Sequence, residues 1–166
     1  MSITTPNAGH ATVVAAEAAE LVEMPSGPAF QLLADASATE GALGANRLTL
    51  TTGADGAEPH YHALSAELFY VLDGAAEFLL KDQMITVVTG GLVVVPPRMP
   101  HAFGAAPATS ADLLVVIAPG IERFGYFRRL QRIALGLDLA ESLLPEQERY
   151  DVHLVQSAAW QTARTT

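Results

Sequence analysis

The chain has no cysteine in its 166 residues. This excludes disulfide bonds, cysteine-bound iron–sulfur clusters and thiolate zinc sites. Any metal that the protein binds must therefore be held by nitrogen and oxygen atoms, which histidine and carboxylate side chains supply.

Basic residues and long apolar runs are also scarce. Nine lysines and arginines stand against 18 acidic residues, so the formal net charge is -9. This charge disfavours binding to nucleic acid or to anionic membranes, because both reward clustered positive charge. No segment reaches the roughly 20 apolar residues of a membrane span, and no signal-peptide pattern is present at the N-terminus. We therefore expect a cytoplasmic protein that binds neither nucleic acid nor membrane.

Length and composition favour one domain with a sizeable core. The 166 residues are 50% hydrophobic, which fits a single domain over residues 1–166 with a barrel core at about 29–118. Short strand-like segments follow one another between Gly, Pro, Asp and Asn, a pattern typical of an all-β sandwich or barrel. Asp73-Gly74 predicts a hairpin, since glycine accepts the positive φ of tight turns. The predicted strands are residues 20–24, 29–34, 46–52, 59–63, 67–72, 75–81, 84–89, 92–95 and 112–118.

The two ends of the chain follow other patterns. Residues 1–19 are small and polar with scattered alanine, and we expect an arm with at most one short element. After Pro119-Gly120 apolar residues recur at intervals of three and four up to Leu137, which predicts an amphipathic helix. A second helical stretch at 139–144 precedes a return to strand alternation at Tyr150. The predicted C-terminal helical segment and final strand therefore occupy about 120–160.

Three histidines and one glutamate lie in two short segments of the predicted barrel. His60 and His62 are two residues apart, so both side chains project from the same face of a strand. Glu67 begins the next strand, and a carboxylate buried there is costly unless a cation accompanies it. The sequence predicts a metal site formed by His60, His62, Glu67 and His101. His10 and His153 are predicted to be solvated.

These residues resemble the two motifs of the cupin family. The first motif, from its histidine pair onward, is matched by His60, His62, Glu67 and Gly74, whereas the glycine expected upstream is off register. The second motif is matched by Gly90, Pro96 and His101, with Arg98 replacing a glycine and Ala105 an asparagine. The segments around Pro119, Tyr150 and Trp160 resemble the ending of single-domain quercetin dioxygenase-like cupins.

The resemblance implies a cupin β-barrel, a double-stranded β-helix or jelly roll, with a C-terminal helical tail. It also implies a metal-dependent dioxygenase of quercetinase-like type that cleaves the ring of an enolic or phenolic aromatic substrate. Glu67 would serve as ligand and as the base that accepts the substrate proton. Phe69 and Val71, on the same face as Glu67, and Phe103 are candidates for a dry substrate pocket, or for ordinary barrel core.

Two other functions fit the same residues. A non-oxidative isomerase, cyclase or lyase would use the cation to stabilise an enolate of a carbonyl compound. A ligand-binding cupin without catalytic activity is the other alternative.

The donor set does not select one metal. One divalent transition metal per chain is expected, with nickel, manganese or iron favoured because related dioxygenases use them, while zinc, cobalt and copper also suit the donors. The expected partners are a small-molecule substrate and dioxygen. A homodimer is also expected, with residues 1–35 contributing, because an antiparallel barrel exposes strand edges.

Overall fold

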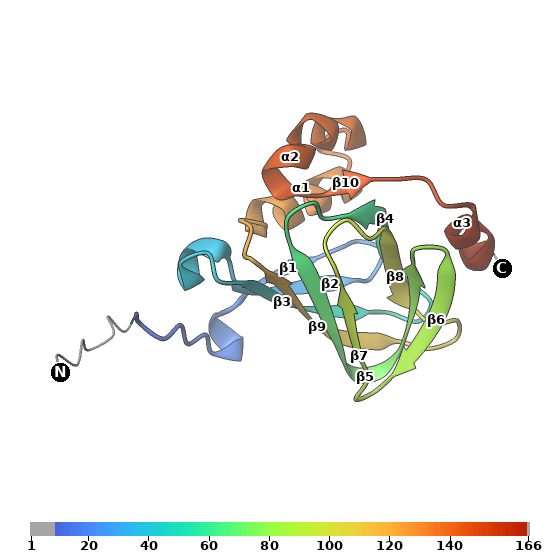
Figure 1. The fold of residues 1–166 in the computed structure, drawn as a ribbon, viewed down its shortest axis with the longest axis horizontal. Helices are drawn as coiled ribbons and strands as arrows, with labels where there is room; N and C mark the ends of the chain where they lie inside the picture. The colour runs from blue at the N-terminus through green and yellow to red at the C-terminus, as the bar shows by residue number, and fades with distance from the viewer. Residues whose placement is uncertain (1–8, 166) are drawn as a thin grey trace, which may run out of the picture.

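The protein is described by a computed structural model over residues 9–165, in which antiparallel strands curl into a barrel with short helices around it (Figure 1). The hydrogen-bonded order is β1-β2-β3-β9-β5-β8-β4-β10, and β6 and β7 also pair with β5. This confirms the predicted all-β barrel. The strands are β1 Glu20–Glu23, β2 Ala29–Ala34, β3 Gly44–Leu50, β4 Asp55–Tyr61, β5 Ala66–Leu80, β6 Gln83–Val88, β7 Leu92–Val95, β8 His101–Ala105, β9 Ala111–Ala118 and β10 His153–Leu154.

Strand β5 is 15 residues long and joins the two sides of the barrel. Its first part pairs with β7 and β9, and its second part pairs with β6 and β8. The predicted hairpin at Asp73-Gly74 is therefore wrong, because the strand continues through it with a register shift against β9 after Val71. Gly74 has a φ of 76°, and a Cβ atom there would collide with the carbonyl oxygen of Ser110. The glycine thus serves a bulge and a close approach of two backbones.

Alternate residues at the start of β5 face the barrel interior, as predicted. Glu67, Phe69 and Val71 are buried, while Tyr70 between them is exposed. The core continues across the barrel to Phe78 and to residues of β3 and β9. A carboxylate therefore lies on the same inward face as the largest core side chains.

Helix α1 (Phe124–Ala134) packs against the barrel and is part of its core. Phe127 is buried and stacks on Phe30 of β2 with ring centroids 4.6 Å apart. The backbone N–H groups of Arg123, which precedes the helix, and of Phe124, its first residue, donate to the carboxylate of Asp35 at 2.6 and 3.2 Å. Such capping satisfies donors that have no partner within the helix. These contacts hold Arg123 at the helix start above the barrel interior.

The C-terminal tail after α1 returns to β4, the strand that carries His60. The 3-10 helix η3 (Ala140–Glu146) and α2 (Gln147–Tyr150) lead into β10, which pairs antiparallel with β4 so that Leu154 lies opposite His60. Figure 1 shows α1, α2 and β10 together at one end of the barrel and α3 (Ala158–Arg164) at the side near β6. Neither β8 nor α3 was predicted, and Trp160 of α3 is buried against Leu79 and Ala102.

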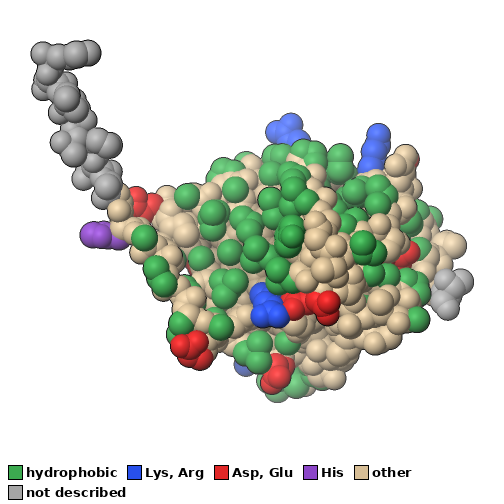
Figure 2. Space-filling model, turned by 90° about the horizontal axis from the view of Figure 1, so that it is seen from below, with side chains coloured by type: hydrophobic (Ala, Val, Ile, Leu, Met, Phe, Trp, Pro, Cys, Tyr) green, Lys and Arg blue, Asp and Glu red, His purple; other side chains and the backbone are tan. Residues whose placement is uncertain are grey.

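The N-terminal region contributes a short 3-10 helix, η1 (Ala16–Ala18), before the edge strand β1. The part of the predicted arm at residues 1–8 lies outside the described residues. Hydrophobic side chains cover much of the molecular face that Figure 2 presents. Within residues 9–165, no helix combines the length and hydropathy that crossing a membrane requires.

Candidate metal centre and its cavity

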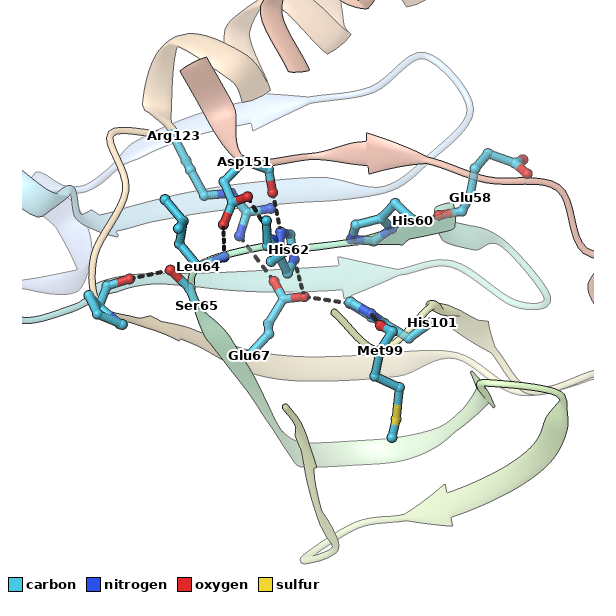
Figure 3. A network of polar contacts seen from close by, with 12 residues as sticks. Glu58, His60, His62, Leu64, Ser65, Glu67, Met99, His101, Arg123 and Asp151 are labelled. Carbon is cyan, nitrogen blue, oxygen red and sulfur yellow. Dashed lines mark hydrogen bonds and ion pairs between the residues drawn. The ribbon is translucent and has the colours of Figure 1, made fainter. Parts of the chain in front are cut away.

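The four predicted ligands come together inside the barrel. One donor atom from each of His60, His62, Glu67 and His101 lies within 4.8 Å of the donor atoms of the other three. All four residues are buried, with exposed fractions of 4%, 2%, 2% and 0%. Figure 3 shows the side chains converging from the barrel strands around the carboxylate of Glu67.

Strand pairing explains the convergence. His60 on β4 lies directly opposite His101 on β8, and the rings of the two residues are 4.4 Å apart. The register of this pair shifts between Ala57 and His60, so β4 bulges just before the ligand and turns it inward. His62 follows the end of β4, and Glu67 is the second residue of β5. The ligands thus lie where one strand, β4, ends and two others, β5 and β8, begin.

The outer nitrogen of each histidine ring is held by a backbone carbonyl. Nδ1 of His60 lies 2.7 Å from the Glu58 carbonyl oxygen, Nδ1 of His62 lies 2.6 Å from that of Asp151, and Nδ1 of His101 lies 2.9 Å from that of Met99. A carbonyl oxygen can only accept, so each Nδ1 carries hydrogen and leaves Nε2 as the donor atom for a metal. Metal-bound histidines are characteristically oriented by such partners.

The inward atoms of the four residues need protons or a metal ion between them. Oε2 of Glu67 lies 2.9 Å from Nε2 of His62 and 2.9 Å from Nε2 of His101. Unprotonated nitrogens and a carboxylate oxygen would repel one another at these distances, and either protons or a metal ion removes the repulsion. Three imidazoles and one carboxylate suit a divalent transition metal. The residues therefore fit the predicted ion, whose identity they leave open.

Electrostatics favour the metal-binding forms of His60 and Glu67. Burial holds the pKa of His60 well below its usual value, and positive charge on His101 and His62 acts in the same direction. Burial by itself raises the pKa of Glu67, but the charge of His62, hydrogen bonds from His101 and His62 and the charge of Arg123 together hold that pKa well below its usual range. A neutral His60 and an ionised Glu67 are the forms that ligate metal.

Two residues that the sequence analysis did not place in the site contact the ligands directly. Arg123 donates through Nη1 to Oε1 of Glu67 at 3.0 Å, and its side chain is 10% exposed. Asp151 supplies the carbonyl that orients His62, and its carboxylate accepts the backbone N–H groups of Ala63 and Leu64 at 2.7 and 3.0 Å. Both lie far from the ligands in sequence, so motif spacing contained no signal for them.

Asp151 also changes the interpretation of His153. Nε2 of His153 lies 3.2 Å from Oδ1 of Asp151, and its ring stacks on Tyr61 at 4.8 Å. The side chain is 14% exposed, so the prediction of a solvated His153 is wrong. His10, in contrast, is exposed as predicted.

A cavity of about 340 Å³ opens onto the metal centre. His60 and Glu67 form part of its wall, whereas most of the remaining wall is apolar, including Phe103 and Phe127. Of the three predicted pocket residues, Phe103 lines the cavity. Phe69 and Val71 do not line it, and both have 0% exposure in the core. The volume lies within the roughly 300–1,000 Å³ of small-molecule sites.

Comparison with protein families supports the fold. A family model described as a cupin domain matches residues 46–117, a range that contains all four ligands. The barrel has the cupin fold. A search of curated proteins found no significant match to it.

Solved structures agree with this cupin fold. An RmlC-like cupin from Shewanella frigidimarina is 22% identical with a TM-score of 0.59, covering 69% of this chain and 96% of that one. The polyketide cyclase RemF from Streptomyces resistomycificus is 18% identical with a TM-score of 0.55, covering 66% and 80%. The nucleoside dehydratase Pac13 is 16% identical with a TM-score of 0.53, covering 66% and 82%. At these identities the likeness concerns the fold.

Arg98 occupies the cupin-motif position where a glycine is expected. Its φ is 70°, and its backbone N–H donates to the His62 carbonyl at 2.7 Å. The left-handed conformation costs a non-glycine residue about 1–2 kcal/mol, part of which glycine loses again as chain entropy. We expect Arg98→Gly to raise the free energy of unfolding by about 1 kcal/mol in urea titrations. Arg98→Ala keeps the unfavourable φ and is the matched control. Equal stability of the two variants would contradict this account.

Proposed function

We propose that this cupin is a metal-dependent dioxygenase of quercetinase-like type, which binds the enol or phenol oxygen of an aromatic substrate and cleaves its ring. The observation that supports this most is the burial of three histidines and one glutamate at the polar end of a largely apolar cavity. Nickel, manganese and iron are the favoured metals, while zinc, cobalt and copper suit the same donors. A bound divalent ion would supply Lewis-acid activation of the substrate oxygen and a position for dioxygen.

The cavity wall would bind the ring and exclude water. Phe30, Leu48 and Val115 line the cavity from the barrel, and Phe127 and Leu130 line it from α1. Apolar walls around a charged centre strengthen electrostatic interactions there and protect reactive intermediates from water. A flat aromatic substrate matches this wall chemically.

The contacts of Glu67 favour a ligand role over a base role. Both carboxylate oxygens have partners, Oε1 with Arg123 and Oε2 with His62 and His101. The pKa of Glu67 lies well below its usual range because those positive partners outweigh the effect of burial. A carboxylate with so low a pKa is a weak proton acceptor near neutral pH. In the proposed reaction, Glu67 chiefly orients and balances the ion.

Dioxygen uptake tests the reaction. Metal-depleted protein is reloaded separately with nickel, manganese, iron or cobalt, and oxygen consumption is recorded with quercetin as substrate. We expect uptake that needs both metal and protein, together with release of carbon monoxide. The exposed His10→Ala variant should retain this activity, and His101→Ala should lose it. No uptake with any fully loaded metal would exclude flavonol cleavage.

Non-oxidative enolate chemistry is the second candidate. The guanidinium of Arg123, beside Glu67 in the cavity wall, favours it because a fixed positive charge stabilises a developing enolate without dioxygen. Structural neighbours named as a nucleoside dehydratase and a polyketide cyclase agree with non-oxidative chemistry of this kind. Turnover that persists under strict anaerobiosis would favour this candidate. Stoichiometric binding without product would instead indicate a ligand-binding cupin.

A homodimer is proposed as the assembly. Apolar side chains on the outward faces of β5 and β7 are exposed, among them Tyr70, Leu72, Leu92 and Val94, and β1 is an edge strand. Exposed apolar patches of this kind are common at protein interfaces. Residues 1–35 were predicted to contribute to the dimer. Strand β1 belongs to that segment, whereas the exposed patch on β5 and β7 does not. A light-scattering mass of one chain at micromolar concentration would contradict the dimer.

A further inference from the structure

We propose that Arg123, together with Asn46, forms a carboxylate-binding subsite in the metal-centre cavity. The substrate class would then be aryl or other largely apolar carboxylic acids that also carry an enol or phenol oxygen. This inference rests on the proposed function, which makes the cavity the substrate site. It goes beyond that function by naming a protein group, besides the metal centre, that would bind the substrate.

Arg123 is only partly satisfied by the protein. Nη1 donates to Glu67, whereas Nε is buried and has no hydrogen-bond partner among residues 9–165. No partner for Nη2 is present in that part of the chain either. One face of the guanidinium lies over the Phe127 ring, with Cζ 5.2 Å from the ring centroid. A buried donor without a partner is costly and rare in folded proteins, so a ligand is the expected partner.

The free atoms form the edge of arginine that is best suited to a carboxylate. Three other arginines of this protein donate through Nε and Nη2 to the two oxygens of one acidic side chain. They are Arg47 with Asp112, Arg128 with Glu20, and Arg132 with Asp138. In Arg123 the same edge has no acidic partner. Its planar fork matches a carboxylate in a way that a single hydroxyl cannot.

Further polar groups line the cavity near the arginine. Asn46 of β3 is 6% exposed, and its side-chain amide makes no hydrogen bond within the described residues. Tyr126 of α1 also lines the cavity, and burial raises the pKa of its phenol, which stays protonated and able to donate. An amide and a phenol complement a carboxylate whose main contact is with the guanidinium.

The charge balance of the cavity points to an anion. The charges of Glu67 and Arg123 cancel, so a divalent ion would leave two uncompensated positive charges at the buried end. The other acidic residue in the wall, Glu58, is exposed. Uncompensated buried charge is unfavourable, and an anionic substrate removes it. A ligand with one oxygen on the metal and a carboxylate on Arg123 satisfies both centres.

Calorimetric binding to zinc-loaded protein tests the subsite without any turnover. The probes are salicylate and salicylamide, which share the ring and the hydroxyl group. Salicylate carries a carboxylate where salicylamide carries a neutral amide. We expect salicylate to bind at least about tenfold more tightly, as charge-assisted hydrogen bonds imply. Arg123→Met should abolish this preference and leave salicylamide affinity within about threefold. Asn46→Ala, which does not contact Glu67, should weaken salicylate binding by a smaller factor.

Arg128→Met is the matched control, because Arg128 lies on the same helix and pairs with Glu20 at the surface. It should change neither affinity. Zinc content is measured for each variant, since Arg123 also contacts Glu67. If Arg123→Met loses zinc, Arg123→Lys retains a cation beside Glu67 without the fork, and it should keep zinc but lose the preference.

Equal binding of the two probes to the unmodified protein would overturn the subsite. A zinc-loaded Arg123→Met or Arg123→Lys variant that still prefers salicylate would do the same. These results are independent of the proposed reaction, because zinc has no redox chemistry. Failure of dioxygen uptake would leave the carboxylate subsite standing, and failure of the subsite would leave the dioxygenase reaction open to test.

Discussion

Replacing His101 with alanine is expected to lower the affinity for divalent transition metals by more than about 100-fold. Loss of a residue that merely orients a ligand typically costs about 10–100-fold, and His101 is itself a proposed ligand. Its ring lies against His60 and Oε2 of Glu67, so its removal also leaves the carboxylate with fewer partners. Competition with a chromogenic chelator measures the affinity for zinc and nickel.

The exposed His10→Ala variant is the control for this measurement and should bind metal like the unmodified protein. Thermal unfolding of His101→Ala without metal checks that the barrel has formed, because His101 has 0% exposure and its loss leaves a small void. A folded His101→Ala protein with unchanged metal affinity would remove His101 from the site and, with it, the four-residue assignment.

Replacing Asp151 with alanine is expected to lower the free energy of unfolding by about 3 kcal/mol. The substitution leaves the buried N–H groups of Ala63 and Leu64 without their charged acceptor, and each such loss costs about 1–3 kcal/mol. The backbone carbonyl that orients His62 is retained in this variant, so we expect metal binding to weaken by less than about 10-fold. Urea unfolding and chelator competition measure the two effects.

Asp151→Asn provides the graded comparison. Asparagine tolerates the positive φ of 50° at this position and retains one acceptor oxygen, so its cost should be clearly smaller. Asp138→Ala removes a surface partner of Arg132 and should leave the unfolding midpoint almost unchanged. If the free energy of unfolding of Asp151→Ala equals that of the unmodified protein, the carboxylate of Asp151 does not stabilise the loop that follows His62.

The local sequence was enough to predict the cupin barrel and the grouping of four metal ligands. His60 and Glu67 lie in strands that follow one another in the chain, β4 and β5, and strand alternation decides which of their neighbours face inward. The motif positions of His62 and His101 added the other two ligands. These features depend on short motifs, within which residue spacing translates directly into geometry.

Where a strand ends was harder to predict. Asp73-Gly74 has the composition of a turn, yet β5 continues through it because β9 and β8 supply pairing partners on both sides of the bulge. Turn propensity is a weak local preference, and a continuous ladder of hydrogen bonds outweighs it. The glycine was conspicuous in the sequence, but its role depends on the backbone of Ser110, which approaches from a distant segment.

The sequence by itself determined the donor set of the candidate metal centre, since it contains no thiol and places nitrogen and oxygen donors at strand spacing. Only the tertiary structure decided what surrounds that chemistry. Arg123 reaches Glu67 across 56 positions of the chain, and the Asp151 carbonyl reaches His62 across 89. The cavity wall likewise combines strands with α1 and the C-terminal tail. Such contacts arise from the packing of distant elements, whose relative placement no short-range periodicity encodes.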